Sequence, residues 1–222
     1  MKFLPLIILF SLIIGCKSNS IDQTKTKSKT DAAITKSSVD KKVIVFFGNS
    51  LTAGYGIDIS EAFPAIIQGI VDSLNLQYQV INAGLSGETT ASGSSRIEWV
   101  LNNKIDIFIL ELGANDGLRG IPTSETRKNL NEIIQKVRDK NPEVKIVLAG
   151  MQVPPNMGPE YSADFKSIFT EIAASSNAAL IPFLLENVGG EPELNLDDGI
   201  HPTPEGHKIV AKNVWTVLKS LL

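Results

Sequence analysis

Apolar runs of strand length alternate with longer stretches of helical period from Lys42 onward. Five such runs predict five strands, at residues 43–47, 79–81, 106–112, 144–149 and 179–183. Runs that are apolar throughout are typical of strands in a parallel sheet, because crossover helices cover both faces of such a sheet. Stretches with a helical spacing of apolar residues lie between them, at 62–74, 95–102, 124–140 and 163–175. The pattern predicts one α/β domain, a three-layer α/β/α sandwich with a five-stranded parallel sheet.

A last helix is predicted near the end of the chain. Thr203 is a suitable N-cap, Pro204 is favoured at the first helical position, and Val210, Val214 and Leu218 share one face. Ligands of open parallel sheets bind outside the carboxyl ends of the strands. Residues that directly follow the predicted strands are therefore the first candidates for chemistry.

The first 16 residues have a different pattern. Met1 and Lys2 precede an apolar segment at 3–14, which is followed by Gly15 and Cys16. A charged start and a short apolar middle are typical of an export signal, and about twelve apolar residues are too few to span a bilayer. The end of this segment resembles the lipobox of bacterial lipoproteins, in which the cysteine is lipidated. We expect a lipoprotein signal peptide at 1–16 with Cys16 as the lipidated residue; a plain signal peptide and an uncleaved anchor are the alternatives.

Residues 17–40 are almost entirely polar, with several lysines. Such a segment buries too little apolar surface to offset the entropy of ordering it, so we expect a disordered polar tether followed by one globular domain at 41–222. Lys17 after the cysteine is similar to the sorting pattern of lipoproteins directed outward. The expected location is an exported bacterial lipoprotein that is anchored to a membrane and faces the periplasm or the cell surface.

Charge and cysteine content narrow the class of protein. The formal net charge of −3 offers no cationic surface for nucleic acid, so no nucleic-acid partner is expected. The single cysteine cannot form an intramolecular disulfide or a cysteine-based metal site. The lipid on Cys16 is the expected membrane contact.

Loops rich in glycine or amide side chains follow the first three predicted strands. The loop at 48–56 presents Ser50 at the carboxyl edge of the sheet, and its glycines permit a tight turn. The loop at 82–89 offers backbone N–H donors at the same edge, and the loop at 113–117 contributes Asn115. Taken singly, Ser50 could equally be a helix cap, and Asn115 could belong to an Asn-Asp turn.

A histidine precedes the last predicted helix. Pro202 biases His201 away from helical conformation and keeps it on a loop. A hydroxyl group is a weak nucleophile until an imidazole accepts its proton, and the imidazole needs a carboxylate to fix its tautomer. Asp198, three residues ahead of His201, can supply that carboxylate. Ser50, Asp198 and His201 are therefore the candidate catalytic residues.

The remaining histidine and a carboxylate metal site are the alternatives to that assignment. The second histidine, His207, falls inside the last predicted helix, where a solvated or core-edge position is expected. A metal site would need more nitrogen or sulfur ligands than the chain offers, which leaves a carboxylate cluster of Glu193, Asp197 and Asp198 as the alternative. We expect no metal and no other cofactor.

The four segments, in this order and spacing, resemble the SGNH hydrolases, also called GDSL-type esterases and lipases, over about residues 42–222. Segments 111–120 (ELGANDGLRG) and 151–156 (MQVPPN) are similar to the family's bacterial acyl-CoA thioesterase I, lysophospholipase L1 and arylesterase group. The resemblance implies a flavodoxin-like sandwich with Ser50 as nucleophile, His201 as general base and then acid, and Asp198 as its orienting partner. It also implies an oxyanion hole formed by the N–H groups of Ser50 and Gly87 and the side-chain amide of Asn115.

The resemblance implies a serine esterase that hydrolyses carboxylic esters or thioesters through an acyl-enzyme on Ser50. Aryl esters, acyl thioesters and lysophospholipids are the expected substrates, with Met157 as a candidate lining residue of an acyl groove. Two alternatives stay open, namely a carbohydrate or peptidoglycan O-acetylesterase and an inactive hydrolase scaffold that serves as a binding lipoprotein. Acyl-chain length and oligomeric state are left undetermined.

One residue departs from the family pattern. Asn49 stands directly before Ser50, where the family usually has aspartate. Asparagine keeps the size and one acceptor oxygen but lacks the charge. We expect the exchange to be tolerated.

Overall fold

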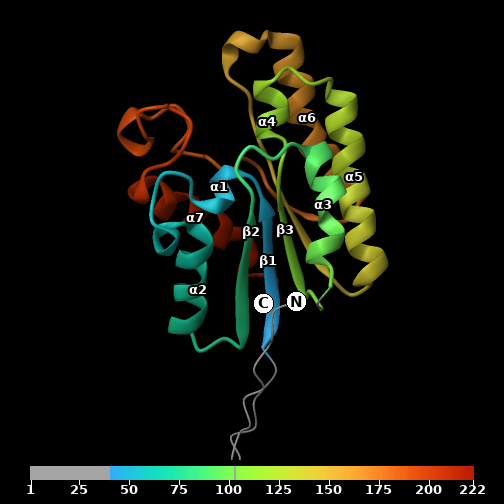
Figure 1. Cartoon of the computed structure of the whole chain (residues 1–222), viewed down its shortest axis with the longest axis vertical. Coiled ribbons are helices and arrows are strands. Elements are labelled where there is room, and N and C mark those ends of the chain that lie inside the picture. The colour runs from blue at the N-terminus through green and yellow to red at the C-terminus, as the bar shows by residue number, and fades with distance from the viewer. Residues whose placement is uncertain (1–40, 103) are drawn as a thin grey trace, which may run out of the picture. The chain divides into compact units, whose positions relative to one another are not determined.

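The predicted five-stranded sheet is present, and all of its strands run parallel (Figure 1). The computed structural model describes residues 41–102 and 104–222, so the signal peptide and tether expected at 1–16 and 17–40 lie outside the described residues. The order across the sheet is β2-β1-β3-β4-β5. The strands are β1 (Lys42–Gly48), β2 (Tyr78–Gly84), β3 (Ile107–Glu111), β4 (Lys145–Ala149) and β5 (Ala179–Ile181).

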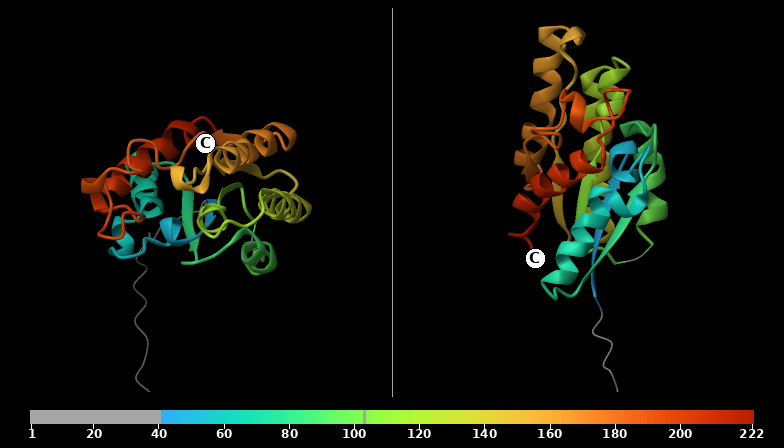
Figure 2. Two further views of the ribbon diagram at one scale, coloured as in Figure 1. Left: turned by 90° about the horizontal axis from the view of Figure 1, so that it is seen from above. Right: turned by 90° about the vertical axis from the view of Figure 1, so that its left-hand side faces the viewer.

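Helices cover both faces of this sheet (Figures 1 and 2). One face carries α2 (Phe63–Ser73) and α7 (Pro204–Leu218), and the other carries α3 (Thr90–Val100), α5 (Thr123–Lys140) and α6 (Pro159–Ser175). The apolar side chains of the central strands are fully buried between the two layers of helices, as at Phe46, Phe47 and Phe108. The predicted α/β fold class is confirmed. Across the two described ranges, no helix combines the length and apolar character needed to cross a bilayer.

Two helices begin earlier than their apolar pattern predicts, because capping residues rather than apolar residues set their starts. The α3 helix begins at Thr90 instead of residue 95, and the Oγ1 of Thr89 accepts a hydrogen bond from the Ser92 N–H (3.3 Å). The α6 helix begins at Pro159 instead of residue 163, directly after Gly158. Proline has no backbone N–H, and it is compatible with a helix start because the N–H groups of the first turn have no intrahelical partner.

Short helices occupy the loops at the carboxyl ends of the strands. They are too short to show a periodic apolar pattern, and the sequence did not predict them. They comprise α1 (Ser50–Ala53), α4 (Ala114–Leu118) and the 3₁₀ helices η1 (Ile59–Glu61), η2 (Pro155–Met157) and η3 (Pro192–Leu194). Asn115 accordingly lies in a helical turn rather than in an Asn-Asp turn.

His207 is buried, so of the two positions expected for it, solvated or at the edge of the core, the solvated one is wrong. Its side chain lies between α7 and α2, where Nδ1 accepts a hydrogen bond from the Phe63 N–H (3.2 Å) and the ring stacks on that of Phe63. Only 1% of the residue is exposed, because α7 packs its buried face against α2 at this point. Desolvation, with a smaller contribution from the charge of His201, lowers the pKa of His207 to about 4.

This burial makes the fold sensitive to acid. A histidine whose pKa is lower in the folded than in the unfolded state stabilises the protein above the unfolded value of about 6.5, and that stability is lost as the pH falls through about 4. His207→Asn keeps an acceptor near the position of Nδ1 and cannot be protonated. Between pH 7 and pH 4, its free energy of unfolding should therefore fall by about 3 kcal/mol less than that of wild type. Urea unfolding across this range measures the difference, and equal slopes for the two proteins would contradict it.

Candidate active site

Ser50 is the first residue of α1 and follows the end of β1 by two positions. The Asn49 side chain caps this short helix by accepting a hydrogen bond from the Leu51 N–H (2.9 Å). Gly54 ends the helix in the left-handed conformation (φ 76°), which glycine adopts without strain. The tight turn leaves Ser50 with 9% of its surface exposed at the carboxyl edge of the sheet.

The structure brings Ser50, His201 and Asp198 together in one hydrogen-bonded chain. The Nε2 of His201 is 2.9 Å from the Oγ of Ser50, and its Nδ1 is 2.6 Å from the Oδ2 of Asp198. Ser50 and His201 are separated by 151 residues in the sequence, so tertiary packing creates this contact. The ring of Tyr55 lies against the imidazole at a centroid distance of 4.5 Å.

The loop that carries His201 is held by its own backbone and by Asp198. The Oδ1 of Asp198 accepts hydrogen bonds from the N–H groups of Ile200 (2.8 Å) and His201 (3.0 Å). The Leu196 N–H in turn donates to the carbonyl of His201 (2.7 Å). The hydrogen bonds from the backbone and side chain of His201, followed by that from Ile200, lower the pKa of Asp198 to about 2. Asp198 is therefore ionised throughout the neutral range.

Gly87 and Asn115 lie on the loops that follow β2 and β3, the two strands beside β1. Gly87 adopts a positive φ of 80°, and the Nδ2 of Asn115 donates to the carbonyl of Glu88 (3.0 Å). One of the two N–H groups on that amide is thereby used, and the other is left to donate. Among the described residues, the backbone N–H groups of Ser50 and Gly87 donate no hydrogen bond to the protein.

Buried ionic groups that sequence reasoning missed hold the Gly87 loop in place. Arg96 on α3 binds the buried carboxylate of Glu88 through Nε (2.6 Å) and Nη2 (2.5 Å), and its guanidinium lies over the ring of Phe47. Asp116 is fully buried and accepts a hydrogen bond from the Thr90 N–H (2.9 Å), which ties α4 to the start of α3. The sequence marks these two carboxylates only by their positions. Glu88 directly follows Gly87, and Asp116 directly follows Asn115.

A third buried carboxylate, also missed, belongs to Glu111 at the end of β3. It is 0% exposed and accepts hydrogen bonds from Asn49 and Thr52, directly beneath the loop that carries Ser50. The burial raises the pKa of Glu111 to about 7, against the opposing effect of these hydrogen bonds. Its position at the end of an apolar strand was the available signal, since charged residues are seldom buried there without a role.

The groups that could hold a metal ion are dispersed. Within 41–102 and 104–222 no cluster of three or more histidine, cysteine, aspartate or glutamate side chains is arranged to bind one. Asp198, a member of the carboxylate cluster weighed from the sequence, is engaged with His201 through Oδ2.

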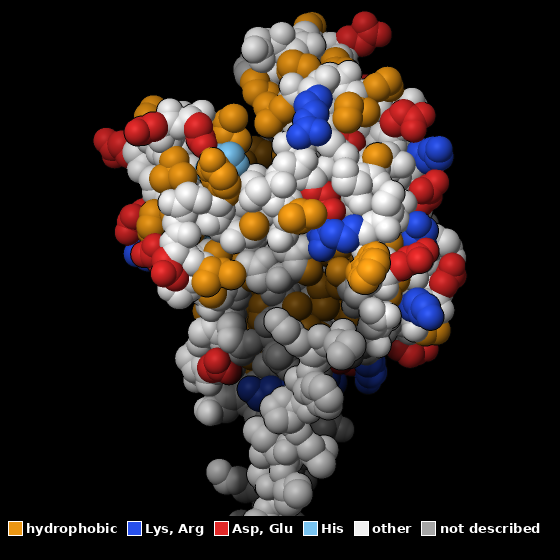
Figure 3. All heavy atoms as spheres, in the orientation of Figure 1, with side chains coloured by type: hydrophobic (Ala, Val, Ile, Leu, Met, Phe, Trp, Pro, Cys, Tyr) orange, Lys and Arg blue, Asp and Glu red, His pale blue; other side chains and the backbone are white. Residues whose placement is uncertain are grey.

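Apolar side chains surround the site. Tyr55, Leu85, Leu118 and Ile200 are exposed on the loops at this edge of the sheet, and hydrophobic side chains are visible on this part of the surface in Figure 3. The arrangement is a hydroxyl hydrogen-bonded to an imidazole, with an apolar rim.

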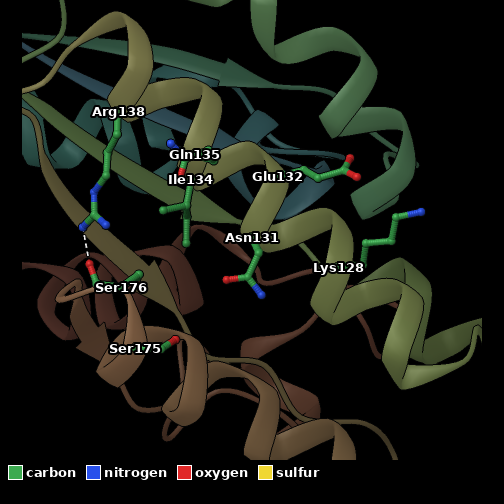
Figure 4. A pocket seen from close by; sticks show the side chains of 8 residues that line it. All are labelled: Lys128, Asn131, Glu132, Ile134, Gln135, Arg138, Ser175 and Ser176. Atoms are coloured by element: carbon green, nitrogen blue, oxygen red, sulfur yellow. Dashed lines mark hydrogen bonds between the residues drawn. The ribbon is translucent and has the colours of Figure 1, made fainter.

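A separate depression of about 600 Å³ lies away from these residues, between α5 and the end of α6 (Figure 4). All of its lining residues except Ile134 have polar side chains, and Arg138 crosses it to the backbone carbonyl of Ser176. It shares no residue with the Ser50 site. The lining consists of Lys128, Asn131, Glu132, Ile134, Gln135, Arg138, Ser175 and Ser176.

Comparisons with known proteins agree with this geometry. The model of the GDSL-like lipase/acylhydrolase family matches residues 46–209. The esterase TesA of Pseudomonas aeruginosa is 37% identical over 182 residues, which are 82% of this chain and 90% of TesA. The thioesterase 1/protease 1/lysophospholipase L1 of Escherichia coli K12 is 34% identical over 76% of this chain and 79% of that protein.

The fold is shared with these relatives as well. A crystal structure of TesA superposes with a TM-score of 0.78, covering 82% of this chain and all of the TesA chain at 37% sequence identity. The family expected from the four sequence segments is thereby confirmed. With its flavodoxin-like strand order and a serine at the carboxyl end of β1, the chain belongs to the GDSL-like lipase/acylhydrolase family, the SGNH hydrolases.

Proposed function

We propose that the protein is a serine esterase that hydrolyses carboxylic esters or thioesters through an acyl-enzyme on Ser50. The observation that carries the proposal is the chain of hydrogen bonds from Ser50 through His201 to Asp198, with separations of 2.9 Å and 2.6 Å. An alcohol in this setting is activated by the imidazole, and the imidazole is oriented by the carboxylate.

The first step forms a bond between the Oγ of Ser50 and the acyl carbon. The Nε2 of His201 accepts the hydroxyl proton and returns it to the leaving alcohol or thiol as the ester bond breaks. Asp198, ionised because its pKa is about 2, stabilises the imidazolium through Nδ1–H. Water then attacks the acyl-enzyme by the same route, which releases the acid and restores Ser50.

The tetrahedral intermediate places a negative charge on the former carbonyl oxygen. We assign its stabilisation to the backbone N–H groups of Ser50 and Gly87 and to the second N–H of the Asn115 amide. The loops after β2 and β3 flank Ser50, and the Arg96–Glu88 ion pair holds the Gly87 loop. Donors that are held in place before the reaction stabilise the transition state without reorganising.

The apolar rim favours acyl or aryl esters over acetylated carbohydrates. Tyr55, Leu85, Leu118 and Ile200 offer exposed apolar surface to an acyl chain, whereas a sugar would require hydroxyl-binding side chains. Met157 has its Cε 3.7 Å from the position a Cβ on Gly120 would take, beside the end of α4, and remains a candidate lining residue. Removal of O-acetyl groups from glycans or peptidoglycan is the second candidate function, because the same catalytic residues serve both reactions.

We further propose that the mature protein is a lipoprotein, with lipid on Cys16 and a polar tether at 17–40. The support is the charged start, the short apolar segment at 3–14 and the lipobox-like end of that segment. A membrane-anchored protein that faces the periplasm or the cell surface follows from this proposal.

Reaction with a fluorophosphonate probe tests the catalytic assignment. Wild type should be labelled at Ser50, and Ser50→Ala should not be labelled. Asp198→Asn should react about 10⁴ times more slowly, because an amide does not hold the imidazole in the required tautomer or stabilise its charge. The second-order rate of labelling, followed by in-gel fluorescence, is the measurement.

Asp197→Asn is the matched control for this experiment, because Asp197 carries an exposed carboxylate on the same loop. It should be labelled at the wild-type rate. Folded wild-type protein that resists labelling would favour the alternative of a binding lipoprotein, and an unchanged rate in Asp198→Asn would remove Asp198 from the mechanism.

Substrate class is decided by comparing two esters. The kcat/KM for p-nitrophenyl octanoate should exceed that for an acetylated xylo-oligosaccharide by at least about tenfold, since each methylene buried against the rim contributes about 0.8 kcal/mol. Steady-state rates at one pH provide the values. A preference for the acetylated sugar would replace the first candidate function by the second.

Lipidation is tested with Cys16→Ala. In a bacterium that processes lipoproteins, wild type should partition into the detergent phase of a Triton X-114 extract and incorporate an alkyne-labelled fatty acid. Cys16→Ala should do neither, because the acylated thiol is absent. Ser18→Ala, two residues away, should behave as wild type; label incorporated into Cys16→Ala would refute the assignment.

A further inference from the structure

The carboxylate of Glu111 is buried beneath the Ser50 loop without a cation. Glu111 ends β3 and pairs in register with Gly48, the last residue of β1. It forms no ion pair within the described residues, and its exposure is 0%. A buried carboxylate without a counter-ion is costly unless hydrogen bonds replace the water that it loses.

Four hydrogen-bond donors from one short segment replace that water. The Oε1 of Glu111 accepts from the Nδ2 of Asn49 (2.8 Å). The Oε2 accepts from the backbone N–H groups of Asn49 (3.1 Å) and Thr52 (3.3 Å) and from the Thr52 hydroxyl (2.7 Å). All of these partners are uncharged donors, and they all belong to the loop that carries Ser50.

The backbone leaves space for this carboxylate. A Cβ on Gly48 would lie 2.4 Å from the Oε2 of Glu111 and 2.2 Å from the Oγ1 of Thr52. Gly48 does not have a positive φ, so conformational freedom is not the reason for glycine here. The first glycine of the Ser50 loop is required by the volume of the Glu111 carboxylate and its partner.

The carboxylate also determines which way the Asn49 amide points. With Nδ2 directed to Glu111, the Oδ1 of Asn49 accepts from the Leu51 N–H (2.9 Å) and lies 3.4 Å from the hydroxyl of Ser50. A flipped amide would place its oxygen against a carboxylate oxygen and lose the bond to Leu51. Glu111 is thereby linked to Ser50 through a single, oriented side chain.

We propose that Glu111 is a positioning residue for Ser50, that it acts through Asn49, and that the amide at position 49 is matched to an ionised carboxylate at position 111. The inference rests on the proposed role of Ser50 as nucleophile. Asparagine at this position is thus one half of a donor–acceptor pair rather than a neutral replacement for aspartate.

The pairing has a consequence for pH. Burial raises the pKa of Glu111 to about 7, and the groups that face it, from Asn49 and Thr52, carry no charge. The imidazole of His201 is connected to this pair only through the Ser50 hydroxyl. Asn49→Asp would place two carboxyl groups in contact, which requires them to share a proton and raises the pKa of the pair further.

An exchange of the two groups tests the proposal in the full-length chain. Glu111→Gln sets amide against amide and should lower kcat about 10- to 100-fold above pH 7, where Glu111 of wild type is ionised, with KM almost unchanged. Asn49→Asp should keep kcat within about threefold of wild type at pH 6 and lose at least about tenfold at pH 9, as the shared proton dissociates. The double variant restores one amide and one carboxylate, so its kcat should recover and its alkaline limb should match that of wild type. Ester hydrolysis from pH 6 to 9 and urea unfolding are measured for each protein.

Asp106→Asn is the matched control, because Asp106 accepts a hydrogen bond from the Val43 N–H at the opposite end of the same strand pair. Its pH profile should be that of wild type. The proposal is overturned if the double variant is neither more active nor more stable than the weaker single variant, or if Glu111→Gln retains wild-type kcat. Unfolding does not depend on catalysis, so recovery of stability in the double variant supports the pairing even if Ser50 proves not to be the nucleophile.

Discussion

The parallel pairing of β1 between β2 and β3 is the constraint on which the site depends. Gly48 pairs with Gly84 on one side and with Glu111 on the other, so all three strands end at the same level. The loops that follow them carry Ser50, Gly87 and Asn115, and these residues meet because parallel strands present their carboxyl ends at one edge. A change in this register would separate Ser50, the proposed nucleophile, from the donors that flank it.

Buried carboxylates stabilise those loops from behind. Glu88 is held by Arg96, Asp116 by the start of α3, and Glu111 by the Ser50 loop, and each is at most 3% exposed. Such groups are costly to bury, so each one favours the single arrangement that satisfies it. The site is therefore rigid where the developing charge is to be stabilised.

The acid-base half of the site is built differently. His201 and Asp198 lie on an exposed turn, and most of the hydrogen bonds that shape this turn are local, from Ile200 and His201 to the Asp198 carboxylate. The turn directly precedes α7, and the position of this helix places His201 beside Ser50. A local turn suffices here because, in the proposed mechanism, the imidazole gives and takes a proton while the donors beside Ser50 remain in place.

The sequence by itself determined the α/β architecture, the strand that presents Ser50 and the histidine loop, because these depend on apolar periodicity and on residues a few positions apart. The spacing of Asp198 and His201 is local, so their hydrogen bond could be anticipated. The burial of His207, the pairing of Glu111 with Asn49 and the ion pair of Arg96 with Glu88 were decided only by the tertiary structure. Each of these depends on which groups are removed from water together, and the desolvation of a polar side chain is a property of its packed surroundings rather than of its position in the chain.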